Sequence, residues 1–96
     1  MLPPPREAES HVYHLFVVRT GARARLREGL AARGIDTGLH YPVPIHRQAA
    51  WLDLGYAEGA FPVSEAAAGT VLSLPIYPHM TDAAVHRVCD AIEASA

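Results

Sequence analysis

The chain has 96 residues, of which 50% are apolar and 19% are charged, and this composition predicts a single soluble globular domain. The formal net charge of −2 argues against a nucleic-acid-binding surface and against a polybasic membrane patch. The sequence lacks an apolar run as long as a membrane span, and its start lacks the hydrophobic region of a signal peptide. With Cys89 as its single cysteine, we expect a cytoplasmic protein.

The basic residues are unusual, because all eight are arginines and none is a lysine. The side chains therefore offer no ε-amino group for a Schiff base or for nucleophilic catalysis by an amine. This absence excludes a whole class of covalent chemistry for the chain by itself.

The N-terminal part predicts a linker followed by a strand. Residues 1–10 include three consecutive prolines, and we expect them to form a linker without a fold of its own. Residues 11–19, HVYHLFVVR, are largely apolar on both alternate faces. This pattern is typical of a strand that is covered on two sides.

A helix and a second strand are expected next. Residues 22–33 are mostly good helix formers, and Gly34 is placed to end that helix in a left-handed conformation. Leu30 and Ile35 are spaced for the hydrophobic contact that accompanies this kind of helix end. Residues 36–40 then predict a short second strand.

The second half predicts two helical segments and a third strand. Residues 46–54 indicate one or two helical turns that end near Gly55, and Pro62 suits the first position of a longer helix. Residues 72–74 predict a three-residue strand. The expected buried stripe of the Pro62 helix consists of Val63, Ala66, Ala67, Thr70 and Val71.

Thr81 is the expected N-cap of a last helix. The predicted buried face of that helix consists of Val85, Val88, Cys89 and Ile92. The element order is then β-α-β-loop-α-α-β-α. This order predicts an α+β fold for residues 11–96, with a small antiparallel or mixed sheet of about three strands that helices cover on one face.

The candidate binding segment is residues 38–46, GLHYPVPIH, which we call the arm. Proline fixes φ near about −65° and favours an extended residue before it, so Pro42 and Pro44 predict a stiff, extended arm. Such a segment loses little entropy on binding, and His40, Tyr41 and His46 give it hydrogen-bonding groups. In the alternative interpretation, the prolines end an edge strand and the aromatic side chains cover a small core.

His14 is a further candidate binding residue, with a satisfied core histidine as its alternative. We predict no metal site and no catalytic residue. His11 and His14 are expected on opposite faces of one strand, and no cysteine or helical carboxylate pattern accompanies His40 and His46. Cys89 is expected as a buried structural thiol rather than a nucleophile.

Several stretches in the same order resemble one protein family. They are YHLFVVR, ARGIDTGLHYPVPIHRQAAW, LGY, FPVSEAAA and VLSLPIYPHMTD. Together they are similar to the C-terminal small domain of the DegT/DnrJ/StrS family of pyridoxal-phosphate (PLP) dependent sugar aminotransferases, which have the aspartate-aminotransferase fold. The resemblance extends from about residue 11 to the last residue.

The resemblance implies amino transfer from glutamate or glutamine to a keto group of a nucleotide-linked sugar. It also implies PLP as cofactor, a dimer with the active site between subunits, and a small domain that covers this site. The family's HYP segment, near the sugar nucleotide, corresponds to His40, Tyr41 and Pro42, with His46 just beyond.

The family's Schiff-base lysine and its other PLP-binding residues belong to a large domain that this sequence does not contain. Met1 falls roughly where the linker between the two domains would run, so we expect a truncated chain: a gene fragment, a mis-assigned start or half of a split protein. One hypothesis is a substrate-covering domain that works with a large domain supplied from elsewhere and is inactive alone. The alternative is a non-catalytic module that binds a small ligand or a partner through the same face.

Overall fold

Two short strands form the centre of the fold in the computed structural model, which describes residues 12–95. Strands β1 (Phe16–Arg19) and β2 (Val71–Leu74) pair in antiparallel fashion, with Phe16 opposite Leu74 and Arg19 opposite Val71. β1 begins five residues later than predicted from the pattern of residues 11–19. The reason is local, since Tyr13 has a φ of 47°, which is not an extended conformation. The predicted linker, residues 1–10, lies outside the described residues, as does His11.

The expected second strand over residues 36–40 is reduced to a single bridge. Gly38 and Ser73 exchange two backbone hydrogen bonds, at 3.0 and 2.8 Å. Pro42 and Pro44 follow and have no N–H to donate, so the pairing cannot continue along the arm. Within residues 12–95 the sheet therefore has two strands and one bridge, which corrects the prediction of about three strands.

Helix α1 (Arg23–Ala31) ends as the sequence predicts. Gly34 has a φ of 70°, and the Ile35 N–H donates to the Leu30 carbonyl at 3.0 Å. Both Leu30 and Ile35 are buried in the core. The contact expected at this helix end is thus confirmed.

Helix α3 (Asp82–Glu93) has the predicted N-cap, because Thr81 Oγ1 accepts a hydrogen bond from the Ala84 N–H at 3.2 Å. Its buried face differs from the prediction. Cys89 is exposed, so the expectation of a buried thiol was wrong. Val85 is exposed as well, and Ala91 joins Val88 in the core. The buried stripe of α3 is narrow, because this helix packs mainly against α1 and not across a wide sheet.

The other helices form a separate lobe, residues 45–70. It consists of the 3₁₀ helices η1 (Ile45–Arg47) and η2 (Ala49–Leu54) and of α2 (Pro62–Thr70). Pro62 opens α2 and Gly55 ends η2 with a φ of 71°, as expected. The predicted buried stripe of α2 is wrong, because Val63 is 77% exposed and Ala68 is the buried residue of this helix. α2 has no sheet beneath most of its length.

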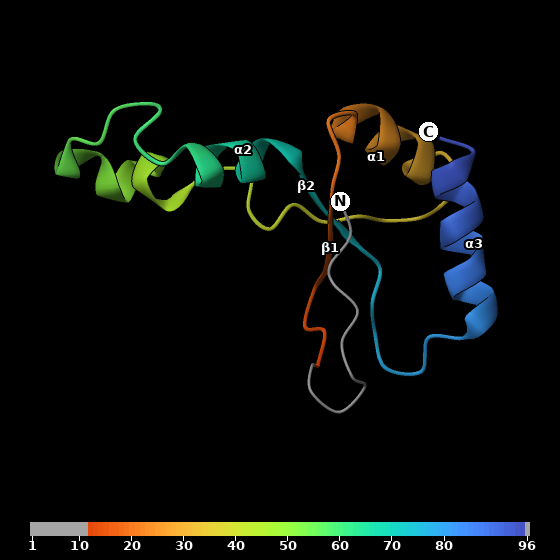
Figure 1. The fold of residues 1–96 in the computed structure, drawn as a ribbon. Coiled ribbons are helices and arrows are strands. Elements are labelled where there is room, and N and C mark those ends of the chain that lie inside the picture. The colour runs from red at the N-terminus through yellow and green to blue at the C-terminus, as the bar shows by residue number, and fades with distance from the viewer. Residues whose placement is uncertain (1–11, 96) are drawn as a thin grey trace.

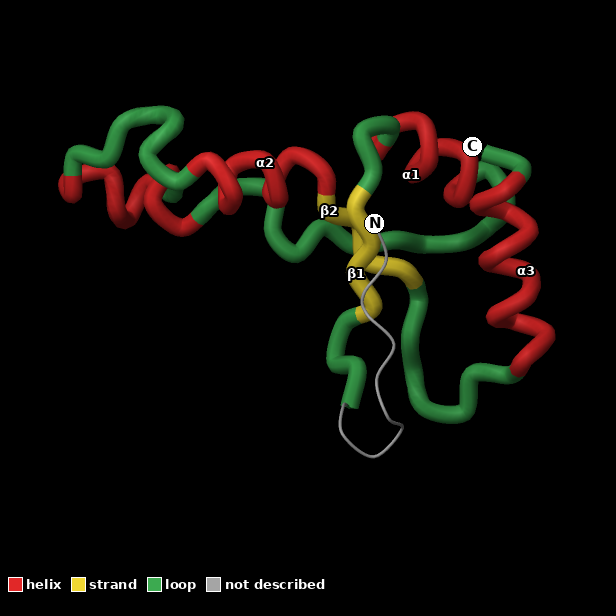
Figure 2. Tube along the Cα trace, in the orientation of Figure 1, coloured by secondary structure: helices red, strands yellow, loops and turns green. Residues whose placement is uncertain are grey.

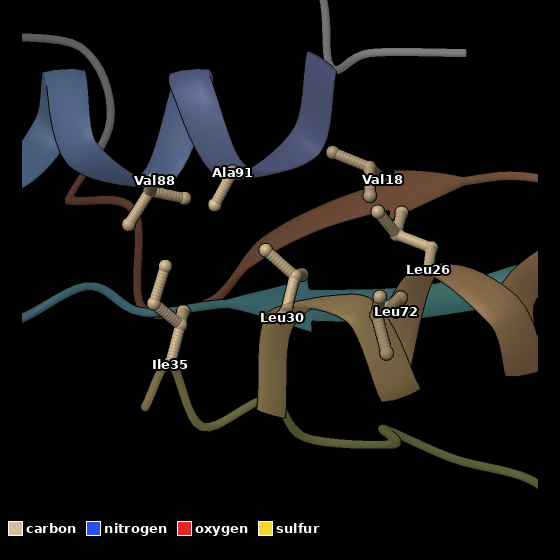
Figure 3. Packing of buried hydrophobic residues seen from close by; sticks show 7 residues of the cluster. All are labelled: Val18, Leu26, Leu30, Ile35, Leu72, Val88 and Ala91. Carbon is tan, nitrogen blue, oxygen red and sulfur yellow. The ribbon is translucent and has the colours of Figure 1, made fainter. Parts of the chain in front are cut away.

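The core lies on one face of the sheet. Val18 and Leu72 face each other across the two strands and are covered by α1 and α3, which lie side by side (Figure 1, Figure 3). This confirms that helices cover one face. The buried side chains of the cluster are Val18, Leu26, Leu30, Ile35, Leu72, Val88 and Ala91. None of the helices within residues 12–95 has the length and apolar character needed to cross a membrane.

The lobe extends away from this core, so the molecule is elongated, with extents of 48 × 33 × 21 Å (Figure 1, Figure 2). Three hydrogen bonds fix the place where α2 joins the sheet. The Thr20 N–H donates to the Thr70 carbonyl at 3.0 Å, and Arg19 Nε donates to Thr70 Oγ1 at 3.1 Å. Arg23 Nη1 donates to the Ala68 carbonyl. The arm connects the core to the lobe.

Candidate functional site

The arm starts on the sheet face opposite the core. Side chains alternate along a strand, so Ser73 points away from the side of its neighbour Leu72. Ser73 is buried nevertheless, because His40 lies over it: His40 Nδ1 is 2.9 Å from Ser73 Oγ. One of these atoms donates a proton to the other, according to the tautomer of the imidazole. The first histidine of the arm is thus held by a buried hydroxyl.

Gly38 makes room for this arrangement. A Cβ at position 38 would lie 2.4 Å from Cε1 and 3.0 Å from Nδ1 of the His40 ring. Both distances are shorter than carbon and nitrogen atoms tolerate without displacement. The imidazole therefore folds back over a residue that lacks a side chain, and the ring keeps its place over Ser73.

Tyr41 is an exposed aromatic residue of the arm, with 70% of its surface accessible. Its ring and that of His40 meet edge to face, with centroids 5.4 Å apart. The two residues border a groove of ≈ 270 Å³ that lies between the arm, η1 and α2. The groove is lined by His40, Tyr41, Val43, Pro44, Ile45, Gln48, Ser64, Ala67, Ala68 and Val71. An anchored imidazole beside a free phenol can donate hydrogen bonds to the oxygens of a ligand in this groove.

His46, at the far end of the arm, is only 9% exposed. Its Nε2 is 2.9 Å from Oε1 of Glu65, which lies in the first turns of α2. The Glu65 carboxylate also accepts the N–H of Gly59 and of Phe61. These contacts lower the pKa of Glu65, the Gly59 N–H most of all, because they favour the ionised carboxylate; burial opposes the effect.

His14 is exposed, in the bend that precedes β1. It extends beyond Phe16, the end of β1 that pairs with Leu74, whereas the lobe joins the sheet at Val71. The four predicted residues are therefore distributed over three places. His40 and Tyr41 share the groove, His46 contacts α2, and His14 lies beyond the opposite end of β1.

The sequence analysis missed two residues that organise the arm, Ser73 and Glu65. Ser73 is a polar residue between two leucines in a predicted strand, and a polar side chain at such a position needs a hydrogen-bond partner when it is buried. Glu65 follows Pro62 in the first turns of a predicted helix, where a carboxylate commonly receives backbone N–H groups. Neither signal identifies its histidine partner.

The comparisons with known proteins concern the family of the whole chain. Residues 1–93 match the DegT/DnrJ/EryC1/StrS aminotransferase family. The chain is 42% identical over 95 residues to the erythromycin biosynthesis sensory transduction protein EryC1 of Saccharopolyspora erythraea, a match that covers 99% of this chain and 26% of that protein. It is 47% identical over 91 residues to the dTDP-3-amino-3,4,6-trideoxy-alpha-D-glucose transaminase of Streptomyces venezuelae, covering 95% of this chain and 24% of that protein.

The fold is similar to that of DesV from S. venezuelae, whose crystal structure was solved in complex with a ketimine intermediate. The TM-score is 0.87 at 46% sequence identity, and the match covers 98% of this chain and 26% of DesV. The chain thus spans about a quarter of the length of the relatives that it matches. It therefore belongs to the DegT/DnrJ/EryC1/StrS aminotransferase family.

Proposed function

We propose that residues 11–96 are the substrate-covering domain of a PLP-dependent nucleotide-sugar aminotransferase, which transfers an amino group from glutamate or glutamine to a keto-sugar. Membership of the family supports the reaction class. The S. venezuelae relative, a transaminase named for a dTDP-linked amino sugar, supports a nucleotide-linked substrate. In this proposal the arm contacts the sugar nucleotide.

The observation that carries the proposal is the contrast between His40 and Tyr41. His40 is fixed on the buried Ser73 hydroxyl, while the adjacent Tyr41 is exposed beside a groove. A purely structural aromatic residue in so small a fold would be expected to cover the core, and Tyr41 does not do so. Its phenol is free to donate to a sugar hydroxyl or a phosphate oxygen, which are acceptors that a nucleotide sugar provides in number.

The residues of this chain do not fit PLP by themselves. The cofactor requires an amine for its Schiff base and groups that hold its phosphate and ring, and the chain contains no lysine. We therefore propose that the chain works with a PLP-binding large domain or with a homologous aminotransferase subunit, in a dimeric enzyme of the family type. The role assigned to the chain is binding and covering of the substrate, and we expect it to be inactive alone.

The test uses a complete enzyme made by joining a matching large domain of the family upstream of Met1. The variants are His40→Ala and Tyr41→Phe. A hydrogen bond to a charged group contributes about 1.5–3 kcal/mol, which corresponds to a roughly 10- to 100-fold loss of kcat/KM for the nucleotide sugar in each variant. The absorbance of the bound cofactor should stay unchanged, because this chain does not hold it.

His86→Ala is the matched control, because His86 is an exposed histidine on α3, away from the arm. It should keep the kinetics of the parent enzyme. His14→Ala and His46→Ala test the two remaining predicted substrate-binding residues in the same assay. Parent-like kcat/KM in both His40→Ala and Tyr41→Phe would refute the proposed role of the arm.

A further inference from the structure

The carboxylate of Glu65, on α2, contacts groups from two neighbouring segments. His46 Nε2, from η1, lies 2.9 Å from Oε1. The Gly59 N–H donates to Oε2 at 2.8 Å and to Oε1 at 3.0 Å, and the Phe61 N–H donates to Oε1 at 3.3 Å. Gly59 and Phe61 belong to the loop between η2 and α2. One side chain thus connects η1, this loop and α2.

Aromatic contacts also connect η1 with the loop between η2 and α2. The rings of His46 and Phe61 have centroids 4.7 Å apart, and those of Phe61 and Tyr56 are 5.0 Å apart. Together with Trp51 and Leu54 they line an apolar groove of ≈ 440 Å³. The polar contacts of Glu65 therefore hold the His46 ring and the backbone of Phe61, two of the aromatic residues of this groove.

The arm is consequently anchored at both ends. His40 is held by Ser73 on the sheet, and His46 is held by Glu65 on α2. The residues between the two anchors include Tyr41, Val43 and Ile45, all of which are exposed. A segment fixed at two points and stiffened by two prolines presents its middle part in one geometry, which lowers the entropy lost when a ligand binds.

We propose that Glu65 and His46 are positioning residues, which lock the far end of the arm and the loop of residues 55–61 onto α2. His46 then acts on the substrate through the geometry of the arm rather than by direct contact. This inference deepens the proposed function and rests on it. The lock itself is a property of the chain alone and can be tested without a substrate.

The first test measures amide hydrogen exchange in the 96-residue chain. In Glu65→Ala the N–H groups of Gly59 and Phe61 lose their acceptor, so their exchange should rise about 10- to 100-fold, while exchange of the core amide of Leu72 stays unchanged. Glu65→Gln keeps the size of the side chain and one carbonyl oxygen, and it should give a smaller increase. Trp51, the single tryptophan, should report the same loosening by its fluorescence.

Glu58→Gln is the matched control for this test. Glu58 lies in the same loop, but its ion pair with Arg47 is long, at 3.8 Å, and exposed. It should leave the exchange of Gly59 and Phe61 as in the parent chain. Unchanged protection of these two amides in both Glu65 variants would overturn the lock, whatever the fate of the proposed function.

The second test uses the complete enzyme described above. Glu65→Gln and His46→Gln should raise KM for the nucleotide sugar about tenfold with little change in kcat, because a loosened arm binds ground state and transition state less well alike. If amide exchange of Gly59 and Phe61 rises in the Glu65 variants while KM stays at the parent value, the positioning role is overturned. The proposed function fails by a different result, namely parent-like kinetics in the His40 and Tyr41 variants.

Discussion

His40 Nδ1 lies 2.9 Å from Ser73 Oγ, and this contact joins the start of the arm to the face of β2 that the helical core does not cover. The backbones of the arm and of β2 also exchange hydrogen bonds, between Gly38 and Ser73. Ser73 therefore contacts the arm both through its backbone and through its hydroxyl. The position of the candidate site depends on a residue of the central sheet.

Ser73→Ala removes the partner of His40 and leaves a partly buried imidazole nitrogen without its hydrogen bond. The expected cost is about 1–3 kcal/mol of unfolding free energy. Urea denaturation of the 96-residue chain measures it. Ser64→Ala, on the exposed start of α2, is the control and should change stability by less than about 0.5 kcal/mol. A Ser73 variant as stable as this control would contradict the importance of the contact.

Gly38→Ala should displace the His40 ring by a steric clash, whereas Ser73→Ala removes the hydrogen-bond partner of the ring. The new Cβ would meet Cε1 at 2.4 Å, so the imidazole has to leave Ser73. We expect a changed chemical shift of the His40 Cε1–H in the NMR spectrum. Because both changes break one contact, the double variant with Ser73→Ala should be clearly less unstable than the sum of the two single variants.

The control for this substitution is Gly69→Ala. A Cβ at Gly69 would meet nothing within 4 Å, and the residue lies inside α2. Alanine there should stabilise the chain by about 0.5–1 kcal/mol, since glycine is a poor helix former. Additive free energies of Gly38→Ala and Ser73→Ala would show that the two residues do not act on the same ring.

Local signals were sufficient to predict the helix ends. Gly34, Pro62 and Thr81 each act through the backbone of their own neighbourhood, so their roles follow from the residue type and its spacing. The family resemblance rested on an ordered series of motifs, and the family match over residues 1–93 confirmed it. The arm was singled out because two prolines stiffen the residues beside them, although its last residues, Ile45 and His46, lie in η1 rather than in an extended segment.

Burial and pairing were harder to predict, because they depend on what an element packs against. The stripe expected on α2 assumed a sheet beneath it, whereas this helix belongs to a lobe that extends from the core (Figure 1). Cys89 was assigned to the core on helical periodicity, and the narrow contact with α1 leaves it exposed. The pairs of His40 with Ser73 and of His46 with Glu65 span 33 and 19 residues, which no local pattern reveals.

Leu30→Ala tests the core that α1 and α3 form on the sheet. Leu30 is completely buried, so the variant loses its transfer free energy and leaves a cavity, at a cost of about 2–5 kcal/mol. Thermal unfolding followed by circular dichroism measures this loss. Val63→Ala is the control, because Val63 is largely exposed, and it should stay within about 0.5 kcal/mol of the parent chain.

The lobe exposes large apolar side chains, among them Trp51, Leu52 and Leu54. Apolar surface of this kind favours association, so the 96-residue chain should bind a hydrophobic dye or self-associate in its native state. The double variant Leu52→Ser, Leu54→Ser should lower both signals while the thermal midpoint changes little. A monodisperse monomer without dye binding, as judged by analytical ultracentrifugation, would contradict this expectation.

The acid dependence of stability tests the carboxylate of Glu65. The Gly59 N–H, helped by His46 and the Phe61 N–H, lowers the pKa of Glu65 in the folded chain. A carboxyl group with a depressed pKa stabilises the fold above its unfolded-state pKa of about 4.3 and loses this contribution as the pH falls from there through the folded value. Urea denaturation of the parent chain and of Glu65→Gln between about pH 3 and 7 should therefore give a stability difference that is constant near neutral pH and narrows on acidification.

His46 is the titratable group that faces this carboxylate, and Arg47 and Glu58 form the charged pair on the adjoining segments. The stability that Glu65 contributes to the His46→Gln variant should still decrease in part below about pH 4.3, because the Gly59 N–H is the larger cause of the depressed pKa of Glu65. Glu58→Gln should follow the parent profile throughout. A stability difference between the parent chain and Glu65→Gln that stays constant down to about pH 3 would mean that the carboxylate gains nothing from its partners in the folded state.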